Sequence, residues 1–323
     1  MSKFINHIWY QQNILKYFLY PFSLIYRFII ATRFFLYRIQ FFKSYRINVP
    51  VIVVGNISVG GTGKTPLVIL LVNALQKAGF QPGIITRGYS GKSKTWPQCV
   101  AEFSNPTMVG DEAVLIAKNT RLPVIAGSNR VNSARQLIRD FQCNIIISDD
   151  GLQHYALARD IEIAVIDSTR RLGNGFCLPA GPLREPKKRL KSVDFIVANG
   201  KAYADEYAMQ FVIDDIVNII DETKKITIAE CENKKIIALA GIGNPERFFE
   251  SLRMLGLAFT PIIFKDHHHF QKSDIVFEND EIIVMTEKDA VKCRSFADER
   301  HFYVRGHAVV DDQLISEIIL RIH

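Results

Sequence analysis

The sequence has few cysteines, and their spacing argues against two kinds of stabilised scaffold. Five cysteines are spread among 323 residues, an odd number that includes no C-x-x-C pair. Neither a disulfide framework nor a zinc site is therefore indicated. Free thiols are typical of proteins in a reducing cytoplasm. A chain of this length is expected to form one large or two medium-sized domains.

The first 50 residues contain no aspartate or glutamate. They hold seven of the 40 Lys and Arg residues and 15 of the 35 Phe, Tyr and Trp residues. The rest of the chain carries 33 basic and 33 acidic residues, so the whole net charge of +7 belongs to this segment. Because the basic excess is confined in this way, we expect no nucleic-acid partner. Aromatic rings interleaved with Lys and Arg are instead typical of a helix on an anionic membrane surface.

Residues 1–48 are therefore predicted to form a membrane-associating helix. We expect its main part to start or kink at Pro21 and to end near Arg46. We expect no membrane-spanning segment, because Arg27, Arg33 and Arg38 interrupt the roughly 18 apolar residues that spanning requires. No small-residue cleavage site of a signal peptide follows. The alternative is a helix that packs on the protein's own core and extends its basic side chains into water.

A strand, a glycine-rich loop and a helix are predicted within the stretch VPVIVVGNISVGGTGKTPLVILLVNALQKAG. The β-branched run from Val49 to Val54 is typical of a buried strand. Apolar residues recur at helical spacing from Leu67 to Ala78, and Gly79 can end that helix. This order is typical of a P-loop, whose backbone amides surround nucleotide phosphates.

The loop fits the pattern G-x-x-x-x-G-K-[ST] except at its first glycine, where Ser58 stands. Gly60 and Gly61 inside the loop partly offset this departure. The lysine of the pattern reaches the β and γ oxygens, and the hydroxyl after it binds magnesium. A glycine-rich turn without a ligand is the alternative, which the flanking strand and helix disfavour. The residues expected to bind the nucleotide are Ser58, Val59, Gly60, Gly61, Thr62, Gly63, Lys64 and Thr65.

Strands and helices alternate after the P-loop. Further strands are expected in QPGIITRGYSG, LPVIAG, CNIIISDDGLQH, DIEIAVID and VDFIVANG. The alternation predicts an α/β fold with a P-loop NTPase-like, doubly wound parallel sheet. We expect the P-loop domain over residues 49–225, and near its end two β-rich stretches and a charged run indicate an extended connection. A second, smaller α/β domain is expected over residues 226–323, ending with the helix DDQLISEIILRI.

Two adjacent carboxylates, Asp149 and Asp150, follow the apolar run IIIS. A buried strand that ends in an acid is typical of a Walker B site, in which an aspartate completes the magnesium shell. Side chains of neighbouring strand residues point to opposite faces, so one of the two should bind the metal directly. The sequence does not distinguish which one. A solvated turn is the alternative.

Three more clusters carry acids, bases or cations. The sequence VGDEA places Asp111 and Glu112 at the start of a predicted helix, where they can also act as capping acids. The Gly/Pro-rich loop LPAGPLREPKKRLK holds Arg184 and Glu185 and either binds an anionic group or forms a basic surface. The sequence FKDHHHF places an acid beside three histidines. Consecutive histidines do not share a face, so one histidine oriented by an acid is a better interpretation than a metal site.

Taken together, seven motifs resemble the tetraacyldisaccharide 4'-kinase family, the lipid A 4'-kinases of Gram-negative bacteria. The motifs are GNISVGGTGKTP, TRGYSG, VGDEA, DDGLQH, LPAGPLREP, DHHHF and TEKDAVK. They extend over most of the chain. That family has serine at the first loop position, so the departure at Ser58 is a feature of the resemblance. The basic, aromatic N-terminus also resembles the family's membrane-associating helix.

The resemblance implies transfer of the ATP γ-phosphate to the 4'-hydroxyl of an acylated glucosamine disaccharide 1-phosphate, giving lipid IVA. It also implies Mg²⁺ as cofactor and a peripheral location at the cytoplasmic face of the bacterial inner membrane. By the family's motifs, Asp111 and His267 are a catalytic pair that acts on the acceptor hydroxyl, with Lys64 on the ATP phosphates. Arg184 is expected near the nucleotide. The expected metal-binding residues are Thr65, Asp149, Asp150 and Glu185.

Two other classes of protein remain as alternatives. A regulatory or metal-delivery GTPase at the membrane surface would share the P-loop, but the sequence TEKD does not match the N-K-x-D or T-K-x-D element of guanine specificity. A nonenzymatic membrane adapter would explain the N-terminus. It would leave the separated acid and histidine motifs without a role.

Overall fold

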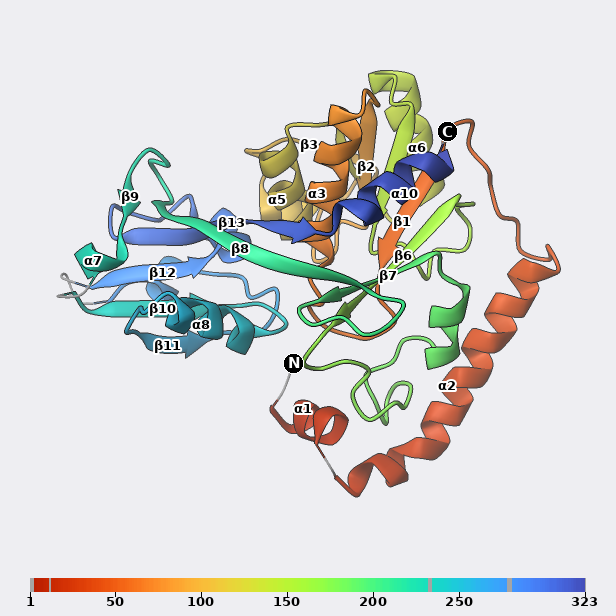
Figure 1. Cartoon of the computed structure of the whole chain (residues 1–323), viewed down its shortest axis with the longest axis horizontal. Coiled ribbons are helices and arrows are strands. Elements are labelled where there is room, and N and C mark those ends of the chain that lie inside the picture. Colours follow the sequence, from red (N-terminus) through yellow and green to blue (C-terminus); the bar gives the residue numbers. More distant parts are fainter. Residues whose placement is uncertain (1–2, 12, 232–233, 278–280, 323) are drawn as a thin grey trace.

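The computed structural model describes residues 3–11, 13–231, 234–277 and 281–322, and in them one mixed sheet runs through the molecule (Figure 1). The order of its strands is β11-β10-β12-β13-β8-β7-β6-β1-β5-β2-β4-β3, and β9 pairs with β8. Six neighbouring strands of the P-loop half are mutually parallel. These are β1 (Val51–Gly55), β2 (Pro82–Thr86), β4 (Val124–Ala126), β5 (Ile145–Asp149), β6 (Ile161–Asp167) and β7 (Phe195–Asn199).

Helices cover both faces of this parallel sheet, as the doubly wound prediction requires. On one face, Ile52 and Ile147 pack with α3 (Lys64–Lys77) and α5 (Asp111–Thr120). On the other face, Val53 and Ile146 pack with α6 (Arg130–Phe141). Strands buried on both sides need continuous apolar runs, and both β1 and β5 have them. The short elements α4 (Pro106–Val109) and β3 (Gln98–Val100) complete this half.

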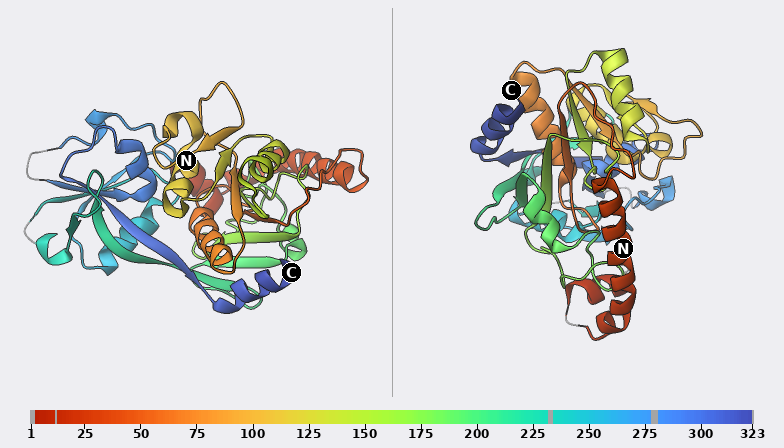
Figure 2. Two further views of the ribbon diagram at one scale, coloured as in Figure 1. Left: turned by 90° about the horizontal axis from the view of Figure 1, so that it is seen from above. Right: turned by 90° about the vertical axis from the view of Figure 1, so that its right-hand side faces the viewer.

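A long two-stranded ribbon connects the P-loop half to a smaller unit (Figures 1 and 2). It consists of β8 (Tyr207–Asn218) and β13 (His301–Val310), which pair antiparallel with a register shift between Arg305 and Gly306. The two β-rich stretches expected here are the strands β8 and β9, but their interpretation as a connection is wrong, because β8 is a full strand of the sheet. The smaller unit contains β9 (Lys225–Ile226), α7 (Ile228–Cys231), β10 (Ile236–Ala240), α8 (Pro245–Met254), β11 (Thr260–Ile263), η2 (Lys272–Asp274), β12 (Ile282–Thr286) and α9 (Glu287–Cys293).

The last helix, α10 (Asp312–Ile322), leaves the smaller unit and returns to the P-loop half. Its buried residues Leu314 and Ile318 belong to the same apolar core as α3. The sequence predicts this helix as the end of the second domain, because its contacts with α3 span some 250 positions and leave no local signal. The domain boundary expected near residue 225 stays a prediction. The sheet is not interrupted between the two units, because β7 pairs with β8 and β8 pairs with β13.

The N-terminal segment forms two helices, α1 (Lys3–Tyr10) and α2 (Leu15–Arg38), the second of which lies along the outside of the P-loop half (Figure 1). Pro21 lies inside α2, and the helix ends at Arg38 instead of near Arg46. One face of α2 contacts the protein: the buried Ser23 hydroxyl donates to the Cys177 carbonyl at 2.7 Å, and the Tyr26 hydroxyl donates to the Arg184 carbonyl at 3.2 Å.

The other face of α2 exposes large apolar side chains, among them Phe18 and Phe28, each 72% exposed. Packing on the protein's own core therefore applies to the face with Ser23 and Tyr26. The expected membrane contact would apply to the opposite, exposed face. By length and composition, α2 is long and apolar enough to cross a membrane, the one such helix among the described residues. The expectation that its arginines interrupt every spanning window is wrong, because a window of 18 residues within the helix holds no more than two charged residues.

Candidate active site

The P-loop joins β1 to α3 as predicted, and glycine is required at two of its positions. Gly60 and Gly63 have φ of +112° and +94°, a region that residues with a side chain rarely adopt. A Cβ atom at Gly63 would also overlap the Asn199 side chain, whose Nδ2 donates to the Thr62 carbonyl at 3.1 Å. The end of β7 therefore fixes the loop where it enters α3.

The loop that carries Arg184 is attached to the P-loop through the backbone. The Val59 amide donates to the Pro182 carbonyl at 2.8 Å, and the Arg184 amide donates to the Ile57 carbonyl at 2.6 Å. Ser58 forms an isolated antiparallel bridge with Leu183. The residue at the first loop position therefore contributes backbone pairing, which serine supports as well as glycine.

Asp150 lies between two cations. Its Oδ1 is 3.3 Å from Lys64 Nζ, and both of its oxygens are 3.1 Å from Arg184 Nη1. Burial alone would raise the pKa of Asp150, but Lys64 and Arg184 outweigh it and hold the pKa well below its usual range. The structure thus brings Lys64, Arg184 and Asp150 together, with the aspartate holding the P-loop lysine in place.

Asp149 is fully buried at the end of β5, and neither of its carboxylate oxygens has a hydrogen-bond partner among the described residues. Burial, followed by the charge of Glu112, raises its pKa to about 7. Unpaired oxygens of this kind fit a divalent cation, which would restore the ionised form. Mg²⁺ commonly uses one or two carboxylates and takes its other ligands from phosphates and water. No cluster of three metal-binding side chains is found in the described part of the chain.

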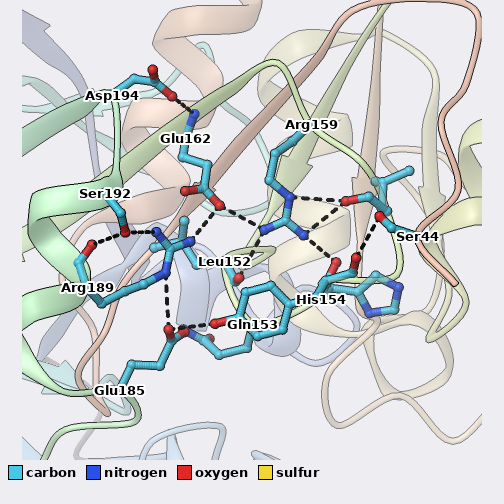
Figure 3. A network of polar contacts seen from close by, with 12 residues as sticks. Ser44, Leu152, Gln153, His154, Arg159, Glu162, Glu185, Arg189, Ser192 and Asp194 are labelled. Atoms are coloured by element: carbon cyan, nitrogen blue, oxygen red, sulfur yellow. Dashed lines mark hydrogen bonds and ion pairs between the residues drawn. The ribbon is translucent and has the colours of Figure 1, made fainter. Parts of the chain in front are cut away.

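Glu185 takes part in a buried network of polar contacts (Figure 3), and the Tyr155 ring of this network packs against Phe34 and Tyr37 of α2. Gln153 Nε2 donates to Glu185 Oε1 at 2.7 Å, and the Tyr155 hydroxyl donates to Oε2, also at 2.7 Å. Arg189, in η1 (Lys187–Ser192), lies 3.2 Å from Oε2 and also pairs with Glu162 at 2.6 Å. Both oxygens are thus engaged by the protein, so these contacts do not support Glu185 as a metal ligand.

Asp111 and His267, 156 positions apart, lie in contact where the two halves meet. His267 Nδ1 is 3.1 Å from each Asp111 oxygen, and Asp111 is the first residue of α5. Burial would raise the pKa of Asp111, but Lys288 and His267 lower it well below its usual range. The Tyr89 ring lies 4.7 Å from the imidazole and orients it. This geometry suits a base that accepts a proton from a bound hydroxyl.

The other two histidines of the cluster point elsewhere. His268 bonds Asp274 at 3.0 Å and packs against the rings of Phe264 and Phe270, while His269 is exposed. One histidine of the three is therefore oriented by an acid of the site. The backbone of His267 is left-handed, with φ of +57°. This turn of the chain directs the His267 side chain differently from those of His268 and His269.

Two lysines beside this pair were not predicted from the sequence. Lys288 and Lys292 stand on α9, and their Nζ atoms lie 2.9 Å from Glu112 Oε1 and 3.8 Å from Asp111 Oδ2. A possible signal was their spacing of four residues, which places both on one face of a helix. They occur in TEKDAVK, which contributed to the resemblance without a role for its residues.

A cleft of about 1710 Å³ opens beside the P-loop between the two halves. Its walls include residues 61–65 of the loop, strands β8 and β13, and α8. The loop tip touches the smaller unit directly, because a Cβ atom at Gly243 would collide with the Gly61 backbone nitrogen. Asp167, at the end of β6, accepts from Asn244 Nδ2 at 3.0 Å and reinforces this junction.

A phosphate loop on a doubly wound sheet, a strand-end acid and a facing acid–histidine pair define a P-loop phosphotransferase. The chain belongs to the tetraacyldisaccharide-1-P 4'-kinase family, whose sequence model matches residues 15–323. This confirms the family expected from the seven motifs, and with it the prediction of a kinase. It also removes the GTPase and adapter alternatives.

Curated relatives match over almost the whole chain. A tetraacyldisaccharide 4'-kinase of Methylobacillus flagellatus is 47% identical, covering 99% of this chain and 96% of its own. That of Coxiella burnetii is 46% identical, with 97% and 95% covered. The crystal structure of Aquifex aeolicus LpxK in complex with ATP has a TM-score of 0.79 at 29% identity and covers 96% of this chain and 100% of its own. The predicted fold class is thereby confirmed.

Proposed function

We propose that this chain transfers the γ-phosphate of ATP to the 4'-hydroxyl of a tetraacylated glucosamine disaccharide 1-phosphate, giving lipid IVA in lipid A biosynthesis. Membership of the 4'-kinase family and likeness to an ATP-bound relative support the reaction. The observation that carries the proposal is the contact of Asp111 with His267 at the junction that also holds the P-loop.

The residues act in two groups. The amides of residues 60–65 and the Lys64 ammonium hold the ATP phosphates, and Arg184 keeps Asp150 against that lysine. Asp111, ionised at neutral pH, orients the acceptor hydroxyl and accepts its proton, while His267 fixes the carboxylate. Phosphoryl transfer depends mainly on positioning and on charge stabilisation. Thr65 and Asp149 would hold Mg²⁺, which neutralises phosphate charge when it is bound.

The reaction itself is tested by incubating the purified protein with labelled ATP, magnesium and disaccharide 1-phosphate lipid. Labelled lipid product is expected. Its absence with every acyl variant of the acceptor, from protein that binds ATP, would overturn the assignment.

The magnesium role predicts an unusual pH dependence of stability. Asp149 has an ordinary pKa of 3.8 when unfolded and about 7 when folded, so without metal the protein loses stability as the pH rises through this range. Asp149→Asn should therefore raise the free energy of unfolding at pH 8 by about 1–3 kcal/mol, the usual cost of an unsatisfied buried group. Chemical denaturation at pH 5 and pH 8 measures this effect.

The same variant should lose turnover, and its unfolding should no longer respond to magnesium. Asp140→Asn, which removes an exposed carboxylate on α6, serves as the control that keeps both properties. Equal stabilisation by magnesium in the Asp149→Asn protein would place the metal elsewhere.

We also propose that the exposed face of α2 binds an anionic membrane surface, at the cytoplasmic side of the inner membrane. Replacing the exposed residues Arg27, Arg33 and Arg38 by glutamine should weaken binding to anionic vesicles by about 1 kcal/mol for each charge near the surface. Sedimentation with vesicles of graded anionic lipid content measures the loss. The matched control neutralises three exposed lysines of the smaller unit, Lys224, Lys234 and Lys272, and should bind normally.

Alkaline extraction of native membranes distinguishes a surface helix from a spanning one. Release of the protein would support the surface position, whereas retention would assign α2 to the bilayer interior. Vesicle binding that is unchanged when the three arginines are replaced would contradict the electrostatic part of the proposal.

A further inference from the structure

The start of helix α9 is fixed by its own threonine and aspartate. The Thr286 hydroxyl donates to Asp289 Oδ2 at 2.7 Å, and the Gly241 amide donates to the same oxygen at 2.8 Å. Asp289 is fully buried. Thr286 and Asp289 of the TEKDAVK motif thus attach the start of α9 to the end of β10. Because the helix start is fixed, the directions in which Lys288 and Lys292 project are fixed as well.

Lys288 projects from α9 into the junction between the two halves. Its Nζ lies 2.9 Å from Glu112 Oε1 and 3.7 Å from Asp266 Oδ1, and its side chain is 16% exposed. Glu112 directly follows Asp111 in the chain, and Asp266 directly precedes His267. The Lys288 ammonium therefore bridges Glu112 and Asp266, the residues next in sequence to Asp111 and His267.

We propose that Lys288 is a positioning residue, whose ammonium holds Asp111 and His267 in contact by bridging Glu112 on the P-loop half to Asp266 on the smaller unit. The proposal rests on the roles assigned above to Asp111 and His267. Without this cation, three carboxylates would approach one another across the junction, and their repulsion in a poorly solvated site would separate the halves.

The other cation of α9 cannot replace this bridge. Lys292 Nζ pairs with Asp289 on its own helix at 2.7 Å and lies over the Phe270 ring, at 3.8 Å from Asp111. Burial would lower the pKa of Lys288, but the charges of Glu112, Asp111 and Asp266 outweigh it and raise the pKa, so the bridge stays charged at neutral pH. The charged groups that act on Asp111 are His267, Lys288, Lys292 and Glu112, while Asp266 lies 3.8 Å from His267 Nε2.

The test compares Lys288→Met with Lys118→Met in the full-length protein. Lys118 is a matched control, because it also spans α5 and α9, is 13% exposed, and pairs with Glu222 at 2.8 Å and with Glu287 at 3.5 Å. Lys288→Met should lower kcat by about 10²-fold through misplacement of the pair, with little change in the KM for ATP. Lys118→Met should keep the kcat of the unsubstituted enzyme per folded molecule.

Two comparisons separate positioning from mere stability. The loss in Lys288→Met should fall on kcat per folded molecule and leave the KM for ATP nearly unchanged. Lys288→Arg keeps the charge and should restore much of kcat. If Lys288→Met folds poorly, Asp266→Asn removes the other end of the bridge at constant volume and should also lower kcat.

A kcat for Lys288→Met equal to that of Lys118→Met, or a kcat for Lys288→Arg as low as that of Lys288→Met, would overturn the proposal. So would an undiminished effect of Lys288→Met in an Asp111→Asn background, because a positioning residue acts through its partner. Normal turnover of Asp111→Asn alone would instead overturn the role of the pair and leave the kinase reaction standing.

Discussion

Replacing Lys64 by alanine is expected to reduce turnover by about 10³-fold or more while the protein stays folded. Lys64 is the first residue of α3, and its ammonium is nearly buried beside Asp150. No other lysine of the P-loop can neutralise the β and γ oxygens as charge develops on them. Arg184 still pairs with Asp150 in the variant, so the local structure should survive.

Steady-state kinetics and thermal unfolding of Lys64→Ala measure these two expectations. Lys64→Met keeps most of the aliphatic volume and should lose as much turnover, which separates the charge from packing. Near-normal turnover of either variant would mean that the loop does not bind the transferred phosphate.

The pair Asp111 and His267 should behave as one unit. Asp111→Ala, His267→Ala and the double variant are expected to show similar losses, of about 10²–10⁴-fold in kcat, because removal of either partner already disables the base. Neither side chain belongs to the phosphate loop, so the affinity for ATP should change little. A double-mutant cycle with single-turnover kinetics places the loss in the chemical step.

His269→Ala is the matched control, since that histidine is exposed and belongs to the same cluster. It should turn over normally. Additive losses for Asp111 and His267 would assign them independent roles, and normal turnover of His267→Ala would remove it from the mechanism.

Local patterns were sufficient to predict the P-loop and the parallel sheet. The apolar runs of β1 and β5 and the helical spacing of α3 are each set within a dozen residues. Asp149 and Asp150 were found in the same way, because a strand end is visible in sequence. The pairing of Asp111 with His267 came from the resemblance alone, since no local pattern joins residues of two different units.

The errors have a common physical origin in distant contacts. The β-rich character of β8 was predicted, but its place in the sheet was not, because its partner β13 lies about 90 positions later. The end of α2 was misplaced because aromatic residues continue after Arg38, whereas the chain turns at Gln40 with φ of +60°. Lys288 and Lys292 were overlooked because both contact acids of α5, and Lys288 also contacts Asp266 in the loop after β11, all of them distant in sequence.

The return of α10 to α3 has a consequence for synthesis on the ribosome. Leu314 and Ile318 fill a core that also contains Leu67 and Leu71 of α3, which are made long before them, and β13 joins β8 just before α10. While the nascent chain lacks these last elements, the outer face of α3 beside the P-loop remains uncovered. The phosphate-binding half therefore completes its core after the smaller unit has emerged, so a stalled or prematurely terminated chain presents an apolar surface to chaperones and proteases.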